Sequence, residues 1–119
     1  MKSLFCMFCT LAIASSVSAQ ETGNAMLKYG LNFLKTPYVA HTLEVNEEEK
    51  LVVNFDEVDC TTFVEYVLAL SLSPVKNGAI DKTDYARVLQ KIRYRDGRIN
   101  GYTSRLHYIA DWINNGVKH

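Results

Sequence analysis

The stretch from Cys60 to Leu72 constrains the fold more than any other part of this 119-residue chain. Its apolar side chains would lie on more than one face of a helix: Phe63, Val64, Val67, Leu68 and Leu70. A helix that is apolar on several faces must be covered by other elements. The pair Ser73-Pro74 ends it, because proline disfavours helical geometry in the residue before it. We therefore expect a central, buried helix over residues 60–72.

The segments before this helix predict one helix and a pair of strands. The range Ala25–Lys35 is typical of a helix that ends at Pro37. Its apolar residues share one face at helical spacing: Leu27, Leu31 and Leu34. The ranges Tyr38–Val45 and Leu51–Phe55 are predicted to pair as a hairpin across the polar residues between them.

Two further helices are expected after it. Asp81 or Thr83 is a candidate N-cap for the first of them. The apolar stripe of that helix is Tyr85, Val88, Leu89 and Ile92. Ser104 is the candidate N-cap of a final helix that ends near Asn115-Gly116. The residues expected to face inward from it are Leu106, Ile109, Ala110 and Ile113.

Residues 1–19 have the pattern of a secretory signal peptide. Lys2 is followed by an apolar run from Leu4 to Ala14, and Val17-Ser18-Ala19 supplies the small residues of a cleavage site. A short membrane anchor retained at the N-terminus is the alternative. The run is too short to span a bilayer about 30 Å thick. We expect an exported protein, periplasmic or extracellular, with no stable membrane insertion, whose residues 20–119 form one small domain.

The charge balance and the cysteines limit what this domain can be. Removal of Lys2 leaves twelve basic residues against thirteen acidic ones, so the net charge is about −1. Nucleic acid is a poor partner for such a chain, because phosphate contacts need a clustered basic surface. Cys6 and Cys9 would leave with the signal peptide, and a single remaining thiol cannot form an internal disulfide. We expect no cofactor and no metal site, and the acidic run at Glu47–Glu49 is interpreted as a solvated turn.

The remaining thiol, Cys60, is a candidate nucleophile. It follows Asp59, a candidate N-cap, where an extended segment is expected to become a helix. Cysteine attacks as the thiolate, and the first turn of a helix favours negative charge. The N–H groups of the same turn can stabilise an oxyanion. The alternative is a structural cysteine, because free cysteines are among the most buried residues.

A cysteine nucleophile needs a general base, which is normally histidine. The candidates after residue 19 are His41, His107 and His119. In the expected final helix, His107 and Asp111 would share one face, and the carboxylate would orient the imidazole. Such pairs are also common on exposed helix faces, so the sequence leaves the base open.

Cations and aromatic rings gather between Arg93 and Trp112. They are Arg93, Tyr94, Arg95, Arg98, Tyr102, Arg105, Tyr108 and Trp112. Guanidinium groups bind carboxylates, and Tyr and Trp stack on sugar faces. The mixture suits a ligand with carboxylate and sugar groups. Alternatively, the rings pack in the core and the arginines are solvated.

With these residues in view, the chain resembles the muramoyl-alanine amidase-like family within the NlpC-type, papain-like cell-wall hydrolases. The resemblance runs from Tyr38 to Trp112 and is strongest at Val58–Glu65, Ile92–Gly97 and Gly101–Tyr108. It implies an α+β papain-like fold and hydrolysis of an amide bond in peptidoglycan, with muropeptides as partners and Cys60 as the nucleophile. The candidate substrate-binding residues are Asp59, Arg93, Tyr94, Arg95, Tyr102, Ser104, Arg105, His107 and Tyr108.

The chain also departs from the NlpC-type pattern. In that family a strand beginning Gly-Asp and then a His-Val-Gly motif follow the helix, and the histidine of that motif is the base. Neither motif is present here. The resemblance therefore implies an incomplete papain-like fold, the N-terminal part of a cysteine amidase domain that lacks later strands. It makes His107 a pocket residue rather than the base.

Three functional hypotheses follow. The first is a cysteine amidase, here represented by the portion that carries the nucleophile. The second is a non-catalytic module that binds muropeptides through residues 93–112. The third is a truncated product with no function of its own, which would expose a large apolar patch. The oligomeric state is left open.

Overall fold

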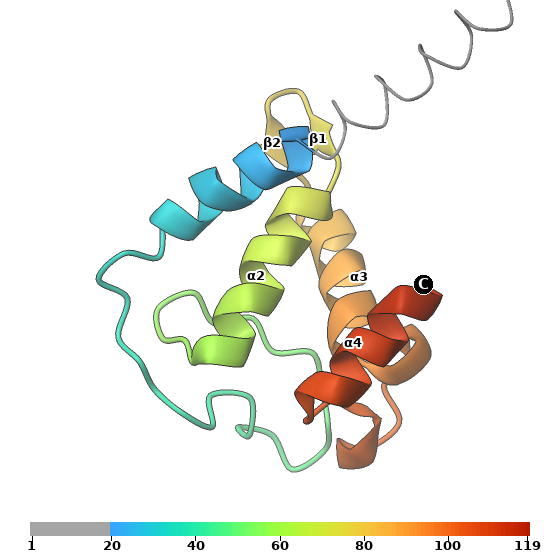
Figure 1. Ribbon diagram of the computed structural model, residues 1–119. Helices are drawn as coiled ribbons and strands as arrows, with labels where there is room; N and C mark the ends of the chain where they lie inside the picture. The colour runs from blue at the N-terminus through green and yellow to red at the C-terminus, as the bar shows by residue number, and fades with distance from the viewer. Residues whose placement is uncertain (1–19) are drawn as a thin grey trace, which may run out of the picture.

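The centre of the molecule is a pair of helices packed side by side, α2 (Cys60–Leu72) and α3 (Lys82–Arg93) (Figure 1). The computed structural model describes residues 20–119 as a small α+β domain. Both predicted helices are confirmed, and α2 has the expected bounds, but it is not buried all round, because Val64 and Leu72 are exposed. The signal peptide predicted over residues 1–19 lies outside the described residues. Within residues 20–119 no helix has the length and apolar character needed to cross a membrane.

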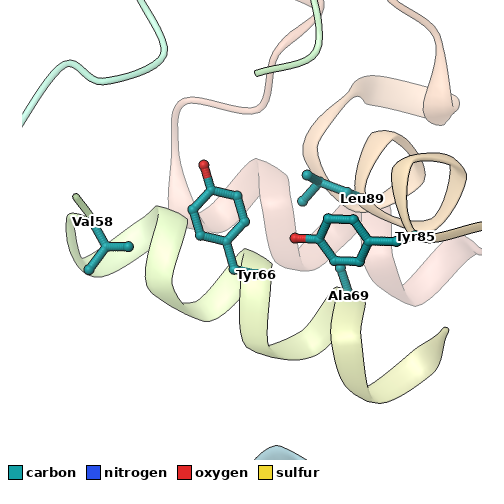
Figure 2. Packing of buried hydrophobic residues seen from close by; sticks show 5 residues of the cluster. All are labelled: Val58, Tyr66, Ala69, Tyr85 and Leu89. Atoms are coloured by element: carbon teal, nitrogen blue, oxygen red, sulfur yellow. The ribbon is translucent and has the colours of Figure 1, made fainter. Parts of the chain in front are cut away.

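The core lies between these two helices. Tyr66 and Ala69 of α2 meet Tyr85 and Leu89 of α3, and Val58 closes the cluster beside the start of α2 (Figure 2). Tyr66, Ala69 and Leu89 are fully buried. The predicted stripe of α3 thus faces the predicted central helix. Asp81 is its N-cap, with Oδ1 accepting hydrogen bonds from the N–H groups of Thr83 and Asp84.

A small hairpin joins α2 to α3. Its strands are β1 (Val75–Lys76) and β2 (Ala79–Ile80), which pair antiparallel with Val75 opposite Ile80. Asn77 and Gly78 between them both have positive φ, of 53° and 77°. Asn-Gly is suited to such a two-residue turn because both residues tolerate that region.

The hairpin predicted from Tyr38–Val45 and Leu51–Phe55 is wrong. Residues 36–59 form a long loop in which Tyr38 and Val58 make one isolated parallel bridge. The backbone of this loop is bound by side chains from the helices instead of by a partner strand. The guanidinium of Arg93 donates to the Val52 carbonyl, and the Asn54 N–H donates to the Tyr66 hydroxyl at 3.0 Å. These contacts hold the loop against α2 and α3.

The described part of the N-terminal helix covers residues 20–31 and is followed by turns to residue 35. Its predicted apolar face exists, but it points to solvent: Leu27, Leu31 and Leu34 are all exposed. The helix instead approaches α2 through Gly30, where a Cβ would lie 3.8 Å from Phe63. The Phe33 ring continues this contact, with its centroid 5.7 Å from that of Phe63.

The last helix, α4 (Ile109–Lys118), follows two short 3-10 turns, η1 (Arg95–Gly97) and η2 (Tyr102–Ser104). The predicted cap Ser104 is wrong, because α4 begins five residues after it and its N-cap is Tyr108, without a side-chain hydrogen bond. The inward face is wrong as well, since Ile109, Ala110 and Ile113 are exposed. Only Leu106 of the predicted set is buried, and it precedes the helix.

Contacts on the other side of α4 fix the helix in place. The buried Asn115 accepts a hydrogen bond from the Asp96 N–H at 3.0 Å, which joins α4 to η1. Trp112 lines an apolar pocket together with Leu68 of α2 and Val88 of α3. The inner face of α4 is therefore partly polar, and its aliphatic residues point outward.

Candidate functional site

Cys60 is the first residue of α2, and the local backbone is fixed by a capping box. Asp59 Oδ1 accepts a hydrogen bond from the Thr62 N–H at 2.8 Å. In return, Thr62 Oγ1 accepts one from the Asp59 N–H at 2.9 Å. This reciprocal pair satisfies two backbone donors and sets where the helix begins. Asp59 is thus the predicted N-cap, and its carboxylate is committed to the helix.

The Cys60 thiol is exposed and free, unlike a structural cysteine buried in a core. The sulfur lies 3.9 Å from Thr61 Oγ1 in a weak side-chain contact. Unsatisfied N–H groups and the helix dipole favour negative charge at this position. The structure therefore presents the sulfur to solvent at the N-terminal end of α2.

A polar pocket of about 310 Å³ lies against the first turn of α2. Its lining comes from three parts of the chain: residues 40–44, the residues Asp59, Thr61, Thr62 and Glu65, and the segment containing Tyr102, Arg105, Leu106 and His107. Segments about twenty and forty residues apart in sequence thus meet at Asp59 and Thr61, the neighbours of Cys60, while Cys60 itself is not among the lining residues. This pocket is the candidate substrate site.

Three of the predicted binding residues meet in the wall of this pocket. The Tyr102 and His107 rings pack at a tilt of 34° with centroids 4.3 Å apart, and Arg105 Cζ lies 5.2 Å from the centre of the Tyr102 ring. Arg105 is largely buried, and its charge is balanced by Glu49 at 3.1 Å and Glu44 at 3.8 Å. A flat aromatic surface over a neutralised cation suits stacking on a sugar or peptide group.

His107 is not placed as the sequence pattern suggested. It precedes α4, and its Nε2 lies 2.9 Å from the Tyr102 carbonyl oxygen. A carbonyl only accepts, so Nε2 carries the proton. The expected partner, Asp111, instead forms an ion pair with Arg95 at 3.6 Å. The predicted His107–Asp111 pair is wrong, and within residues 20–119 no histidine side chain forms a hydrogen bond with Cys60.

Arg93 and Tyr94 lie inside the protein, where they have no direct access to a ligand. The Arg93 side chain is fully buried, and its Nε donates to Glu65 Oε2 at 2.6 Å. The Tyr94 hydroxyl donates to Glu49 Oε1 at 2.7 Å, and the Lys50 carbonyl oxygen shares that hydrogen at 3.2 Å. Burial and the Glu49 carboxylate raise the pKa of Tyr94 well above its usual range. In this structure Tyr94 can act on the pocket only through the loop that it holds, and Arg93 through that loop and through its contact with Glu65.

Glu65 lines the pocket while forming its ion pair with Arg93, and it was not predicted as a site residue from the sequence. Burial raises the pKa of the Glu65 carboxyl, and the Arg93 guanidinium opposes that shift. The signal for this residue was a glutamate in an otherwise apolar helix, because a buried carboxylate requires a partner. The partner is 28 residues away, so it could not be named from the sequence.

The other predicted binding residues lie outside the pocket lining. Ser104 donates to the Gly101 carbonyl at 2.6 Å and accepts from the Asn100 N–H at 2.9 Å, which closes a turn. Tyr108 is 74% exposed, and Arg95 is half-exposed beside Asp111. Their roles in binding remain predictions.

A second, larger hollow of about 690 Å³ adjoins the first and shares Leu43, Glu44 and Tyr102 with it. Its rim carries the acidic loop residues Glu47, Glu48 and Glu49. Within the described part of the chain, no group of three or more His, Cys, Asp or Glu side chains is arranged to hold a metal ion.

Comparison with known proteins identifies the family. Residues 28–119 match the AmiA-like family, described as N-acetylmuramoyl-L-alanine amidase-like. Because the match covers most of the chain, the protein belongs to this family. No curated protein matches it.

Similar solved structures include one named as an amidase and one named as a xylanase. An N-acetylmuramoyl-L-alanine amidase from Bacteroides uniformis ATCC 8492 is 65% identical, with a TM-score of 0.76 over 78% of this chain and 40% of that one. A putative xylanase from Bacteroides fragilis is 62% identical, with a TM-score of 0.73 over 77% of this chain and 39% of that one. The chain thus spans about two fifths of the length of these relatives.

Proposed function

We propose that this protein contributes the nucleophile-bearing part of a cysteine amidase that cleaves peptidoglycan between N-acetylmuramic acid and L-alanine. The observation that carries the proposal is the exposed thiol of Cys60 on the first turn of α2, beside a polar pocket, in a member of an amidase-like family. The 65% identity to an N-acetylmuramoyl-L-alanine amidase supports the choice of bond. The fold that fits this chemistry is the papain-like, NlpC-type arrangement, of which residues 20–119 would form the helical part.

The reaction has two steps. The Cys60 thiolate attacks the lactyl carbonyl carbon, a C–S bond forms, and the carbonyl electrons move to oxygen. When the tetrahedral intermediate collapses, the C–N bond breaks and the peptide leaves as an amine that takes a proton from a general acid. Water, deprotonated by the same group acting as base, then hydrolyses the thioester and releases the muramic acid carboxylate and the thiol. First-turn N–H groups of α2 stabilise the oxyanion in both steps.

The general base is the part of this mechanism that residues 20–119 do not provide at Cys60. His107 is the histidine in the pocket lining, and its Nε2–H is engaged by the Tyr102 carbonyl. We assign the base to a histidine outside residues 20–119. It would lie in a polypeptide equivalent to the three fifths of the relatives' length that the match does not cover. His107 then orients the substrate together with Tyr102 and Arg105.

The pocket wall supports a muropeptide as the substrate. The exposed ring of Tyr102 offers a stacking surface for the sugar. Arg105 is already paired with two carboxylates, so its remaining role is to hold Tyr102 and the loop at Glu44–Glu49 in place. Peptidoglycan lies outside the cytoplasm, which agrees with the signal peptide predicted over residues 1–19.

Amide hydrolysis is preferred over the glycoside hydrolysis that the name of the Bacteroides fragilis relative suggests. Glycosidases generally use two carboxyl groups that flank the bond. The two nearest Cys60 along α2 are already committed, Asp59 to the helix cap and Glu65 to Arg93. The Cys60 thiol in the first turn of α2 is exposed and has no such strong partner.

The test uses a chimera, defined as residues 20–119 joined to the part of the Bacteroides uniformis amidase that lies outside the match. We expect the chimera to release peptides with an N-terminal L-alanine from muropeptides, detected by mass spectrometry, and to leave xylan intact. Cys60→Ala should abolish release, while the neighbouring control Thr61→Ser should retain it. Release of reducing sugar from xylan, or undiminished peptide release by Cys60→Ala, would overturn the proposal.

The second candidate function is a module that binds muropeptides without catalysis. It is favoured because no histidine among the described residues contacts Cys60. In that case the chimera would bind muropeptides in calorimetry without turnover, and the Cys60→Ala variant would bind equally well.

A further inference from the structure

Thr42 is a buried polar residue of the candidate pocket to which the proposed function gives no role. It lines the pocket at the first turn of α2 together with Asp59 and Thr61, and it is 8% exposed. Its Oγ1 is shielded from water and has no hydrogen-bond partner among the described residues. Thr42 therefore places in the pocket wall a hydroxyl that nothing within the domain satisfies.

The other buried polar side chains of this wall have charged partners. Glu65 pairs with Arg93 at 2.6 Å, and Arg105 pairs with Glu49 at 3.1 Å. Nitrogen atoms of the Arg105 guanidinium also lack a hydrogen bond, but the ion pair compensates its charge. A buried hydroxyl without a partner lowers the stability of a fold, so threonine at position 42 calls for a reason other than stability.

A tight turn sets the position of Thr42 in the wall. The Glu44 N–H donates to the His41 carbonyl at 3.3 Å, and His41 has a positive φ of 65°, a region that histidine enters more readily than most residues. A threonine side chain occupies staggered rotamers, and a change between them exchanges its methyl and hydroxyl groups. The hydroxyl can therefore turn toward the pocket without any change in the backbone of this turn.

We propose that the Thr42 hydroxyl hydrogen-bonds a neutral amide group of the substrate, on the peptide side of the bond that Cys60 attacks. Thr42 is then a substrate-binding residue that determines specificity. The inference rests on the muropeptide substrate of the proposed function and adds a requirement to it. The carbonyl of the L-alanine must belong to an amide linkage, and a free carboxylate at that position is disfavoured.

The charges around the pocket favour a neutral group over a carboxylate. The lining contains the carboxylates of Glu44, Asp59 and Glu65, and the guanidinium of Arg105 is already paired with Glu44 and Glu49. A further carboxylate would lie among like charges, which disfavours its ionised form. A hydroxyl donates to an amide carbonyl or accepts from an amide N–H, so it suits either side of this linkage.

The test compares two ligands that differ in one group. They are N-acetylmuramoyl-L-alanine, which ends in a carboxylate, and its neutral primary amide. Binding is measured by calorimetry at pH 8, where an ordinary histidine is neutral. The reference protein is the full chain carrying Cys60→Ala, so that no turnover contributes. Thr42→Val, Thr42→Ser and the matched control Thr103→Val, at an exposed threonine, are added to it.

We expect the reference to bind the amide at least about fivefold more tightly than the carboxylate. Thr42→Val should weaken binding of the amide about threefold to tenfold, the range for loss of one neutral hydrogen bond. Thr42→Ser retains the hydroxyl and should stay within about twofold of the reference, as should Thr103→Val.

Thermal unfolding separates this role from a structural one. Valine has the shape of threonine without the hydroxyl, and the hydroxyl has no partner within the domain. The unfolding midpoint of Thr42→Val should therefore equal or exceed that of the reference, while its affinity for the amide falls. A hydroxyl that only stabilised the fold would give a lower midpoint.

Four results would overturn the inference. They are no binding of the amide by the reference, equal affinity of the reference for the two ligands, undiminished amide binding by Thr42→Val, and a midpoint of Thr42→Val more than about 2 °C below the reference. None of these measurements requires the thiol. Failure of the chemistry assigned to Cys60 would appear in the chimera as absent peptide release, with the Thr42 results unchanged.

Discussion

Arg93 and Glu65 form an ion pair in the centre of the domain, with Nε and Oε2 2.6 Å apart and the two side chains 0% and 2% exposed. The pair joins the end of α3 to the middle of α2. Through the Val52 carbonyl, the same guanidinium also binds the long loop. Glu65 lines the pocket beside Cys60, so this pair connects the stability of the core to the shape of the candidate site.

Removal of either side chain of this ion pair should therefore lower the stability of the domain strongly. Arg93→Ala leaves the Glu65 carboxylate buried and unpaired, and we expect a loss of about 3–5 kcal/mol in the free energy of unfolding. Urea denaturation followed by circular dichroism measures it. The control is Arg95→Ala, at a half-exposed side chain, which should change stability by no more than about 0.5 kcal/mol. The double variant Glu65→Leu, Arg93→Met should recover most of the loss, and failure to recover would show that the contact to Val52 dominates.

The capping box of α2 gives a second prediction. Asp59→Ala removes the acceptor of the Thr62 N–H, and we expect a loss of about 1 kcal/mol, within the usual range for an N-cap. Asp56→Ala, at an exposed loop residue nearby, is the control for the loss of one negative charge. Equal denaturation curves for Asp59→Ala and the parent would mean that the cap does not fix the start of the helix.

The loop that borders the pocket should loosen when Tyr94 loses its hydroxyl. Tyr94→Phe removes a hydrogen bond to a carboxylate, and we expect a loss of about 1.5–3 kcal/mol. Hydrogen exchange at residues 44–52 should increase in this variant. Tyr108→Phe, in which the altered side chain is mostly exposed, should leave both measurements unchanged. Unchanged exchange in Tyr94→Phe would show that Arg93 and Arg105 hold the loop without the Tyr94 hydroxyl.

Acid should weaken the start of α3 in a defined way. Hydrogen bonds from the Thr83 and Asp84 N–H groups hold the pKa of Asp81 below its usual range. A carboxyl with a lowered pKa in the folded state stabilises above its unfolded pKa, and this contribution is lost as the pH falls through the folded value. The Asp81→Asn variant retains an acceptor but cannot titrate. We expect the parent to lose more stability than Asp81→Asn below about pH 4 in thermal melts. Parallel pH profiles would contradict this assignment.

Local patterns in the sequence predicted the helices well and their surroundings poorly. Helix α2 and its cap at Asp59 were predictable because the apolar run, the capping residue and Pro74 agree over a short span. The stripe of α3 was predictable for the same reason. Periodicity shows that a helix has an apolar side but not what covers it, so the inward face predicted for Ile109 and Ile113 was wrong.

The hairpin prediction failed for a different reason. The residues 51–55 have strand-like composition, but their backbone groups are bound by Arg93 and Tyr66, side chains from two helices. Such contacts join residues 12 and 41 positions apart, beyond any local pattern. The candidate site was predictable at Cys60 and in part at Tyr102, Arg105 and His107. Glu65, Thr62 and the loop residues 40–44 complete the pocket only after the chain has folded.

The central claim is that Cys60 forms a covalent bond with the substrate, and intact-protein mass spectrometry tests it most directly. The chimera is mixed with a muropeptide, quenched in acid within one turnover, and compared with its Cys60→Ala variant. We predict a mass increase equal to the muramoyl acyl group, mapped to the peptide that contains Cys60 and absent from the variant. Peptide release at the parental rate by Cys60→Ala, with no adduct on Cys60 in the parent, would contradict the claim.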